Sequence, residues 1–478
     1  MFVDFEASSA SIPKNAEFCI VGSGPAGMTL ALELERHGRS VLLLEGGGLE
    51  WTPESYELYR GDVIGDYYIN IEYARARQLG GTSSHWGGWC YQLSELAFKG
   101  KPGFEDTPWP IQKKDLDPYL ERARVVLDIE APPDATMLDP EFGIKDVQLT
   151  HSKVRFGQRY RERLSQSQHI ICATSANLTG LKTDGRDIVA ATVRNFKGKS
   201  VTVKAKYFIL AMGGIENSRM LLWFNHQANG QLVDSRAPLG RYWMEHPAYE
   251  LGYALLGFEI PKGGLHRPTL VVTFTEDVFL KLGTLECSLI LEGTSKTGTK
   301  KLLKDLICVA PRVGEWAASL ARRDTLCGVN LSIKCEQEPV WNNHVKLSES
   351  KHDRFGIPLA ELHWKKTERD RATMQKTLTH FNEFLMAKHH GRLKVQDWVF
   401  ATEGYPSSGR EGLSWHHLGG TRMALSPAKG VVDKNCRVFG QGNLYIAGSS
   451  VFPSGGEANP TLSIVQLSLR LADHLMKS

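Results

Sequence analysis

Two adjacent histidines near the end of the chain are the first candidates for chemistry. They are His416 and His417 in the segment SWHHLGGTRM, residues 414–423. An imidazole can act as a general acid or base because its ordinary pKa lies close to neutral pH. Successive side chains of an extended segment point to opposite faces, so one pocket can receive only one of these rings. The other ring is expected to support the structure or to line the edge of the pocket.

A glycine-rich segment near the N-terminus predicts a nucleotide-binding site, the alternative being a glycine-rich turn in an unrelated α/β domain. Residues 17–45 read EFCIVGSGPAGMTLALELERHGRSVLLLE, an apolar run, a glycine turn, an amphipathic helix pattern and a second apolar run. The glycine spacing suits a tight turn, close approach of the backbone to a pyrophosphate, and close packing of helix on strand. The acid that ends the second run can accept hydrogen bonds from a ribose. The predicted contacts are Gly22, Gly24, Pro25, Ala26, Gly27 and Glu45.

Elements of the same type recur in the middle and near the end of the chain. Residues 201–222 predict a strand, a turn at Gly213 and Gly214, and a helix. The C-terminal part predicts a strand that ends at Gly448 and a helix from about Pro460. A nicotinamide enzyme with one contiguous nucleotide-binding domain does not need these repeats. They favour a discontinuous domain with a longer cofactor lying across it.

Composition and charge exclude several classes of protein. The 478 residues are 42% hydrophobic and 23% charged, and the net charge of +4 is too small to indicate a nucleic-acid or membrane partner. The sequence contains no apolar run of about 18 residues, so we expect no membrane span. The eight cysteines have no metal-ligand spacing, so we expect reduced thiols and no metal site. The start of the chain lacks an export-signal pattern, which predicts a cytoplasmic location, with export alongside a partner left open.

Six motifs, in order and spread over the whole chain, resemble those of the glucose–methanol–choline (GMC) oxidoreductase family. They are GSGPAG with Glu45, RQLGGTSSHWGG at 77–88, ILAMGGIENSRMLL at 209–222, LGRYWMEHP at 239–247, HHLGGTRM at 416–423 and GGEANPTL at 455–462. The histidine in SSHWGG and the closing ANPTL are most similar to the bacterial branch of pyranose oxidases and glucoside 3-dehydrogenases. The resemblance implies oxidation of an alcohol to a carbonyl with FAD, the alcohol being most often a sugar or glycoside hydroxyl.

The resemblance also implies roles for individual residues. The catalytic histidine of the family lies four residues before the Thr that Thr421 matches, which indicates His417 as the base and turns His416 away. Asn459 holds the place of the partner residue that fixes the substrate oxygen. Asn459 and Pro460 also form an ordinary helix start, and the two interpretations are compatible. The dipole of that helix would favour negative charge on the reduced flavin.

Further cofactor contacts follow from the same resemblance. His85 matches a position at which some pyranose oxidases attach FAD covalently, and this link is possible here but not favoured. The remaining predicted contacts are Gly80, Gly81, Ser84, Trp86, Leu178, Gly213, Gly448, Asn459, Pro460 and Thr461.

The segment from residue 246 to residue 414 predicts a separate substrate domain. Its runs of apolar and β-branched residues indicate a broad, mainly antiparallel sheet. Gln337 and His416 are candidate substrate contacts. Residues 298–325 predict one or two amphipathic helices with a solvated basic face, the alternative being contact with a membrane or a partner.

The predicted fold class is α/β, or α+β overall, with a discontinuous Rossmann-like FAD-binding domain and a substrate domain. The FAD-binding domain takes residues 1–95, 150–245 and 415–478, and the substrate domain takes 96–149 and 246–414. A flavin monooxygenase and a non-catalytic FAD-binding protein are the alternative functions. The reduced flavin would pass its electrons to oxygen, a quinone or a redox protein, and the sequence predicts neither this acceptor nor an oligomeric state.

Overall fold

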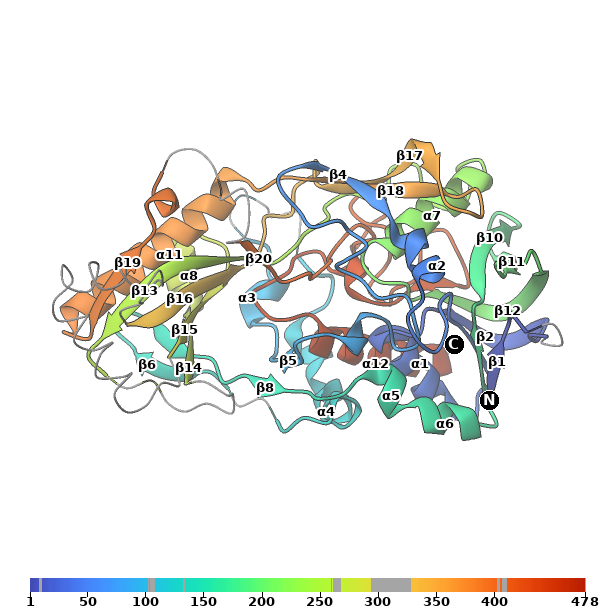
Figure 1. Ribbon diagram of the computed structural model, residues 1–478, viewed down its shortest axis with the longest axis horizontal. Helices are drawn as coiled ribbons and strands as arrows, with labels where there is room; N and C mark the ends of the chain where they lie inside the picture. The colour runs from blue at the N-terminus through green and yellow to red at the C-terminus, as the bar shows by residue number, and fades with distance from the viewer. Residues whose placement is uncertain are drawn as a thin grey trace, which may run out of the picture.

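Two large sheets and the helices around them make up the protein. The computed structural model describes residues 1–7, 11–101, 103, 108–131, 134–258, 260, 268–293, 328–401, 405 and 411–477. Figure 1 shows one sheet with its helices on the right, where both chain ends lie, and the other sheet on the left. The mixed α/β architecture with two large sheets confirms the predicted fold class.

The first sheet collects strands from three distant parts of the chain. Its order is β1 (Phe2–Asp4), β9 (Ile170–Thr174), β3 (Val41–Leu44), β2 (Asn15–Val21), β12 (Ser200–Leu210), β11 (Ile188–Arg194) and β10 (Asn177–Thr183), with β21 (Leu444–Ile446) also paired to β12. The pairs from β1 to β12, and β12 with β21, are parallel. Parallel strands covered on both faces are apolar throughout, as VLLL in β3 illustrates.

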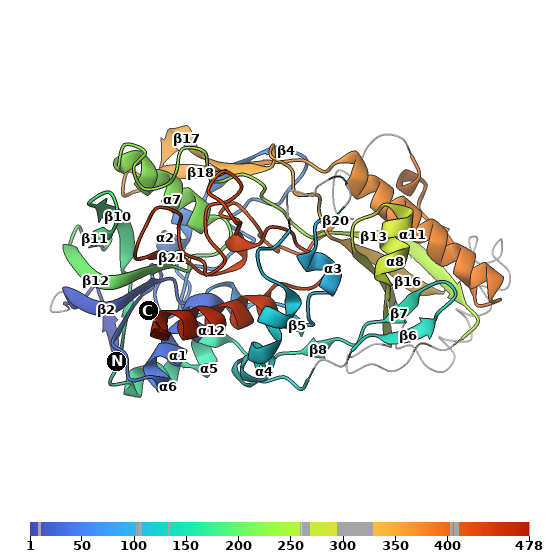
Figure 2. The same cartoon turned by 180° about the vertical axis from the view of Figure 1, so that it is seen from behind.

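Helices on this sheet begin where the cofactor motifs predicted. Helix α1 (Pro25–Arg36) starts after the extended residue Gly24, with proline in its first turn. Helix α7 (Glu216–Gln227) follows the turn after β12, and α12 (Thr461–Lys477) begins one residue after Pro460. Figure 2 shows α12 lying beside α1, and the two helices are in contact. Helices from the two ends of the chain therefore pack together on this sheet.

The second sheet is antiparallel throughout. Its order is β19 (Gly391–Val395), β13 (Pro247–Leu256), β16 (Val329–Cys335), β15 (Cys287–Glu292), β14 (Thr269–Phe274), β7 (Ile144–Asp146) and β6 (Thr136–Asp139), with β20 (Glu411–Leu413) paired to β13. Helix α11 (Glu368–Ala387) covers one face, and α8 (Glu276–Leu282) lies beside it (Figure 1). Cys287 contacts Thr377 of α11 at 3.0 Å, whereas the next residue, Ser288, bonds to Glu457 on the other face.

A third sheet joins two distant segments of the chain. Strands β17 (His344–His352) and β18 (Pro358–Trp364) lie within the predicted substrate segment, but β18 pairs in parallel with β4 (Gly61–Gly65). Arg219 of α7 donates to the Pro358 carbonyl at 2.8 Å and forms an ion pair with Asp353 at 2.7 Å. These contacts hold residues 344–364 against the cofactor domain.

Short elements complete the described chain. They are α2 (Pro53–Tyr56), β5 (Trp89–Cys90), α3 (Glu95–Phe98), α4 (Leu120–Leu127), β8 (Thr150–His151), α5 (Phe156–Arg159) and α6 (Arg161–Gln166). Six cysteines within the described residues are buried free thiols. Among those residues no helix has the length and apolarity needed to cross a membrane. The helices predicted at 298–325 lie outside the described residues.

Candidate active site

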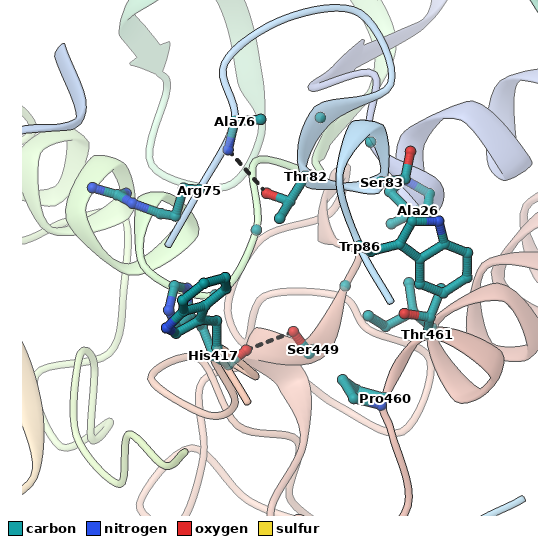
Figure 3. Close-up of a pocket in the computed structure, with 18 of the residues that line it drawn as sticks. Ala26, Arg75, Ala76, Thr82, Ser83, Trp86, His417, Ser449, Pro460 and Thr461 are labelled. Atoms are coloured by element: carbon teal, nitrogen blue, oxygen red, sulfur yellow. Dashed lines mark hydrogen bonds between the residues drawn. The ribbon is translucent and has the colours of Figure 1, made fainter. Parts of the chain in front are cut away.

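A cavity of about 280 Å³ lies where the predicted motifs meet. In Figure 3, Trp86 and Thr461 stand on one side of it, while Arg75 and His417 stand on the other. The strand ends of the parallel sheet open onto this region, which is the usual place for ligands in such sheets. The predicted residues on its wall are Gly22, Gly24, Pro25, Ala26, Glu45, Gly81, His85, Trp86, Gly213, His416, His417, Gly448, Asn459, Pro460 and Thr461.

The first glycine turn has the shape that a dinucleotide requires. A Cβ on Gly24 would meet nothing within 4 Å, because this residue faces the cavity. A Cβ on Gly22 would lie 2.3 Å from the Ala211 carbonyl oxygen, and one on Gly27 only 1.9 Å from the Gly22 oxygen. Gly22 and Gly27 therefore allow the close backbone packing of the turn, and Gly27 lies behind the cavity wall. Gly24 leaves the space beside the helix N-terminus open.

Glu45 is fixed at the end of β3 by three hydrogen bonds. One carboxylate oxygen accepts from the Ser23 backbone N–H at 3.1 Å and from its hydroxyl at 2.6 Å, and the other accepts from the Gly47 N–H at 2.8 Å. A second cavity of about 70 Å³ shares Gly22 and Glu45 with the first and is lined by Leu178. The two cavities together suit an elongated dinucleotide with its ribose beside Glu45, so these residues fit FAD.

Two predicted contacts shape the loop without lining the cavity. Gly80 has φ of 86°, its N–H donates to the Ser23 hydroxyl at 3.1 Å, and a Cβ there would lie 2.2 Å from the Gly157 nitrogen. The Ser84 hydroxyl donates to the Gly81 carbonyl at 2.8 Å. Both residues hold the backbone that presents Gly81 to the cavity.

His85 and Trp86 lie where the loop meets the cavity. The Trp86 indole N–H donates to the Val154 carbonyl at 2.8 Å, which fixes the ring. His85 is exposed at the cavity, and partial burial, followed by the charge of Arg155, lowers its pKa below the ordinary value. A neutral, accessible imidazole is compatible with a covalent link to the cofactor but does not require one.

His417 is held from behind the cavity by a buried chain of polar groups. Its Nε2 lies 3.0 Å from the Tyr68 hydroxyl, which donates to Glu245 at 2.5 Å. The ring packs against Trp243, with centroids 5.6 Å apart. Burial, followed by the charge of Arg75, lowers the pKa of His417 to about 3. One nitrogen of this imidazole is therefore already used by the protein.

His416 points to a different set of groups. Its Nδ1 lies 2.9 Å from Nδ1 of His246, and its backbone N–H donates to Glu245 at 2.7 Å. Among the described residues, Nε2 has no hydrogen-bond partner, and the ring lines the cavity. Burial, followed by the charges of His246 and Lys334, lowers the pKa of His416 well below its ordinary value.

Asn459 shares a neighbour with His416. Its Oδ1 accepts from the Lys334 ammonium at 2.6 Å. The amide nitrogen has no hydrogen-bond partner among the described residues, and Asn459 lines the cavity. The Ile464 N–H donates to the Pro460 carbonyl at 2.8 Å, so the first turn of α12 closes directly after Asn459. The cavity thus receives an amide donor from one segment and an imidazole from another.

Gln337 is not on the cavity wall, which corrects its expected role as a substrate contact. The side chain is 1% exposed. Its oxygen accepts from the Glu245 backbone N–H at 2.8 Å and from the Trp364 indole at 2.9 Å, and its nitrogen donates to the Lys365 carbonyl at 3.2 Å. Both ends of the amide are used, so Gln337 supports Glu245 from behind.

Several residues of the site carry no signal that sequence reasoning detected. Lys334 lies in a strand with no motif, and Tyr68 lies in a loop. Glu245 and His246 belong to the motif LGRYWMEHP, so their presence near the site was available in the sequence. Trp415 is 43% exposed on the cavity wall with φ of 54°, an uncommon value for a bulky residue.

The fold is shared with solved oxidases. Pyridoxine 4-oxidase from Mesorbium loti superimposes with a TM-score of 0.59 and 15% identity, covering 97% of this chain and all of that one. Formate oxidase from Aspergillus oryzae gives 0.57 and 15%, covering 98% and 99%. At these identities the likeness shows the fold alone.

Sequence comparison decides the family. The fructose dehydrogenase large subunit of Gluconobacter japonicus is 24% identical over 561 aligned positions, covering 97% of this chain and 98% of that one. A family model for an NAD(P)-binding Rossmann-like domain matches residues 20–48, and one for GMC oxidoreductase matches residues 339–468, which contain both histidines and Asn459. Residues 339–468 of the chain thus belong to the GMC oxidoreductase family.

The names of other relatives of this GMC oxidoreductase describe enzymes that act on hydroxyl compounds. The 2-methyl-1,2-propanediol dehydrogenase of Mycolicibacterium austroafricanum is 24% identical, covering 96% of this chain and 94% of that one. A C-glycoside 3-oxidase of Microbacterium trichothecenolyticum is 29% identical over 148 residues, 31% of this chain and 27% of that one. This GMC oxidoreductase is accordingly an FAD-dependent enzyme that acts on a CH–OH group of a small molecule.

Proposed function

We propose that this enzyme oxidises a hydroxyl of a sugar or glycoside, with His416 as the base and Asn459 as the oxygen anchor. The observation that carries the proposal is a pair of polar atoms at the cavity, Nε2 of His416 and the amide nitrogen of Asn459, neither of which has a hydrogen-bond partner in the described part of the chain. An alcohol oxidation needs one acceptor for the hydroxyl proton and one donor for the oxygen. The names of the fructose, glycoside and diol relatives support a polyhydroxylated substrate.

The proposal of His416 as the base differs from the expectation of the sequence analysis, which indicated His417 because it lies four residues before Thr421. Nε2 of His417 contacts Tyr68, whose proton goes to Glu245, so this nitrogen serves best as a donor inside the protein. His416 lies near Lys334, which also contacts Asn459. The alternation of the two side chains thus supports His416 as the ring beside the anchor.

The partner His246 favours the tautomer that a base requires. Burial lowers the pKa of His246 to about 3, whereas the backbone of Gly456 and Gly455 favours a proton on the ring; Nε2 lies beside Gly455 but has no hydrogen-bond partner among the described residues. A proton on Nε2 would leave Nδ1 of His246 as an acceptor, and His416 would then donate from its own Nδ1. Nε2 of His416 then keeps its lone pair for the cavity.

The residues divide the reaction between them. FAD, when bound, supplies the acceptor for the carbinol hydrogen and its electron pair. His416 takes the hydroxyl proton at Nε2, and burial keeps the ring neutral beforehand. Asn459 donates from its amide nitrogen to the substrate oxygen as negative charge develops there. Trp86, fixed by Val154, forms part of the cavity wall.

Anaerobic mixing with a panel of sugars, glycosides and diols tests the proposal. An alcohol alone should bleach the flavin in wild type and far more slowly in Asn459→Ala. Bleaching that requires a nicotinamide would instead support a monooxygenase, and no bleaching under any condition would support a non-catalytic FAD-binding protein. Oxygen uptake compared with reduction of a soluble quinone or a redox protein then assigns the electron acceptor.

A further inference from the structure

Lys334 is a buried lysine in the floor that the antiparallel sheet forms beside the cavity. It is 8% exposed and lies near the end of β16, where the next residue, Cys335, is also buried. Alternation along the strand sends Cys335 towards Asp370 of α11 and Lys334 to the opposite face. The lysine therefore belongs to the substrate domain but reaches Asn459, which belongs to the cofactor domain.

The directions of the hydrogen bonds around Lys334 are fixed by chemistry. A lysine ammonium can only donate, so Asn459 must present its oxygen to it, at 2.6 Å. The same ammonium donates to the Tyr91 hydroxyl at 2.7 Å. Tyr91 in turn gives its proton to the Glu457 carbonyl at 2.6 Å, which leaves its oxygen free to accept. Each hydrogen bond in this series therefore has a single possible donor and acceptor.

We propose that Lys334 is a positioning residue that fixes the amide of Asn459 with its nitrogen towards the substrate oxygen. An unconstrained asparagine can turn its amide over and present an acceptor, which would repel an oxygen that is becoming negative. The ammonium prevents this inversion because it binds only the oxygen. The proposal rests on the anchor role of Asn459 in the proposed function.

The electrostatic surroundings agree with this role. Burial lowers the pKa of Lys334, and the nearby carboxyl of Glu457 acts in the opposite direction and favours the ammonium. Its charge also lowers the pKa values of His416 and His246. The same lysine that orients the anchor therefore helps to keep the base neutral.

A double-mutant cycle between Lys334 and Asn459 tests the proposal. The readout is the rate of anaerobic flavin reduction at saturating alcohol in holoenzymes that carry Lys334→Met, Asn459→Ala or both. Loss of a charged hydrogen bond predicts a decrease of roughly 10- to 100-fold for Lys334→Met in the wild-type background. In the Asn459→Ala background the further loss should shrink to about threefold or less. Lys334→Gln, which can still donate to the amide oxygen, should recover part of the rate.

A matched control separates orientation from the general effect of removing a buried charge. Lys101 is also buried, and it forms ion pairs with Glu286 and Glu336 rather than with Asn459. Lys101→Met should lower the melting temperature, and any rate loss should add to that of Asn459→Ala.

The outcomes are distinguishable. Additive losses for Lys334 and Asn459 would overturn the positioning role, and so would failure of both neutral Lys334 variants to retain FAD, since the lysine would then serve the fold alone. An Asn459→Ala enzyme with an unchanged rate would overturn the anchor in the proposed function instead.

Discussion

Replacement of each adjacent histidine by alanine should have very different effects on catalysis. His416→Ala removes an imidazole whose Nε2 lines the cavity without a hydrogen-bond partner among the described residues, and loss of a general base slows a reaction by about 100- to 10,000-fold. His417→Ala instead leaves the Tyr68 hydroxyl without its 3.0 Å partner, in a buried site. The hydroxyl still donates to Glu245, so the loss is one buried hydrogen bond, worth about 0.5 to 1.5 kcal/mol of stability. We expect a lower melting temperature for His417→Ala with a much smaller loss of rate.

The assay is anaerobic stopped-flow reduction of both variants by the same alcohol, with FAD content and melting temperature measured alongside. The flavin should stay bound in both, because the contacts of Gly24 and Glu45 are unchanged. A larger rate loss for His417→Ala than for His416→Ala, with FAD retained, would refute the assignment of His416. It would instead support His417, which lies four residues before Thr421, as the base.

Further predictions concern the cofactor and the buried acid. Gly24→Val should purify without FAD but with a near-normal fold, because its side chain points into the open space of the cavity. Gly27→Ala should instead unfold more easily, because its Cβ would lie 1.9 Å from a carbonyl oxygen. Flavin absorbance and melting temperature, measured for both variants, test this difference. Acid precipitation of wild type and His85→Ala should show whether flavin colour stays with the protein, and a yellow pellet from the variant would contradict a link at His85. Burial raises the pKa of Glu245 from 4.5 to about 7, so the folded state holds this proton more tightly and the free energy of unfolding should fall by about 3 kcal/mol as pH rises through that interval. Glu245→Gln should remove this part of the pH dependence, and urea unfolding at several pH values measures it.

The cofactor half of the protein was predictable because its constraints are local. Gly22, Gly24 and Gly27 are each required within one turn, so spacing alone reveals their roles. The antiparallel sheet was predictable in type from its apolar runs. The pairing of β18 with β4 was not, because nothing local in either strand specifies a partner about 300 residues away.

The choice between the two histidines needed tertiary structure. Alternation establishes that His416 and His417 diverge, but which ring keeps an unpartnered Nε2 at the cavity depends on their contacts with Tyr68 and His246, from distant segments. Lys334 is one lysine among many in the sequence, and only the packing of the second sheet against the Asn459 turn gives it a role. Gln337 was misplaced because a polar residue after a strand is equally suited to a cavity or to a buried support.

The strand order of the parallel sheet also determines when the protein can acquire its flavin during synthesis. β2 emerges early, its neighbour β12 follows after the loop and helices of the site, and β21 and the Asn459 turn come last. A chain still on the ribosome therefore has an open edge on β12 and only part of the pocket. We therefore expect flavin binding to follow the synthesis of residues 444–461, which complete both the edge of β12 and the cavity.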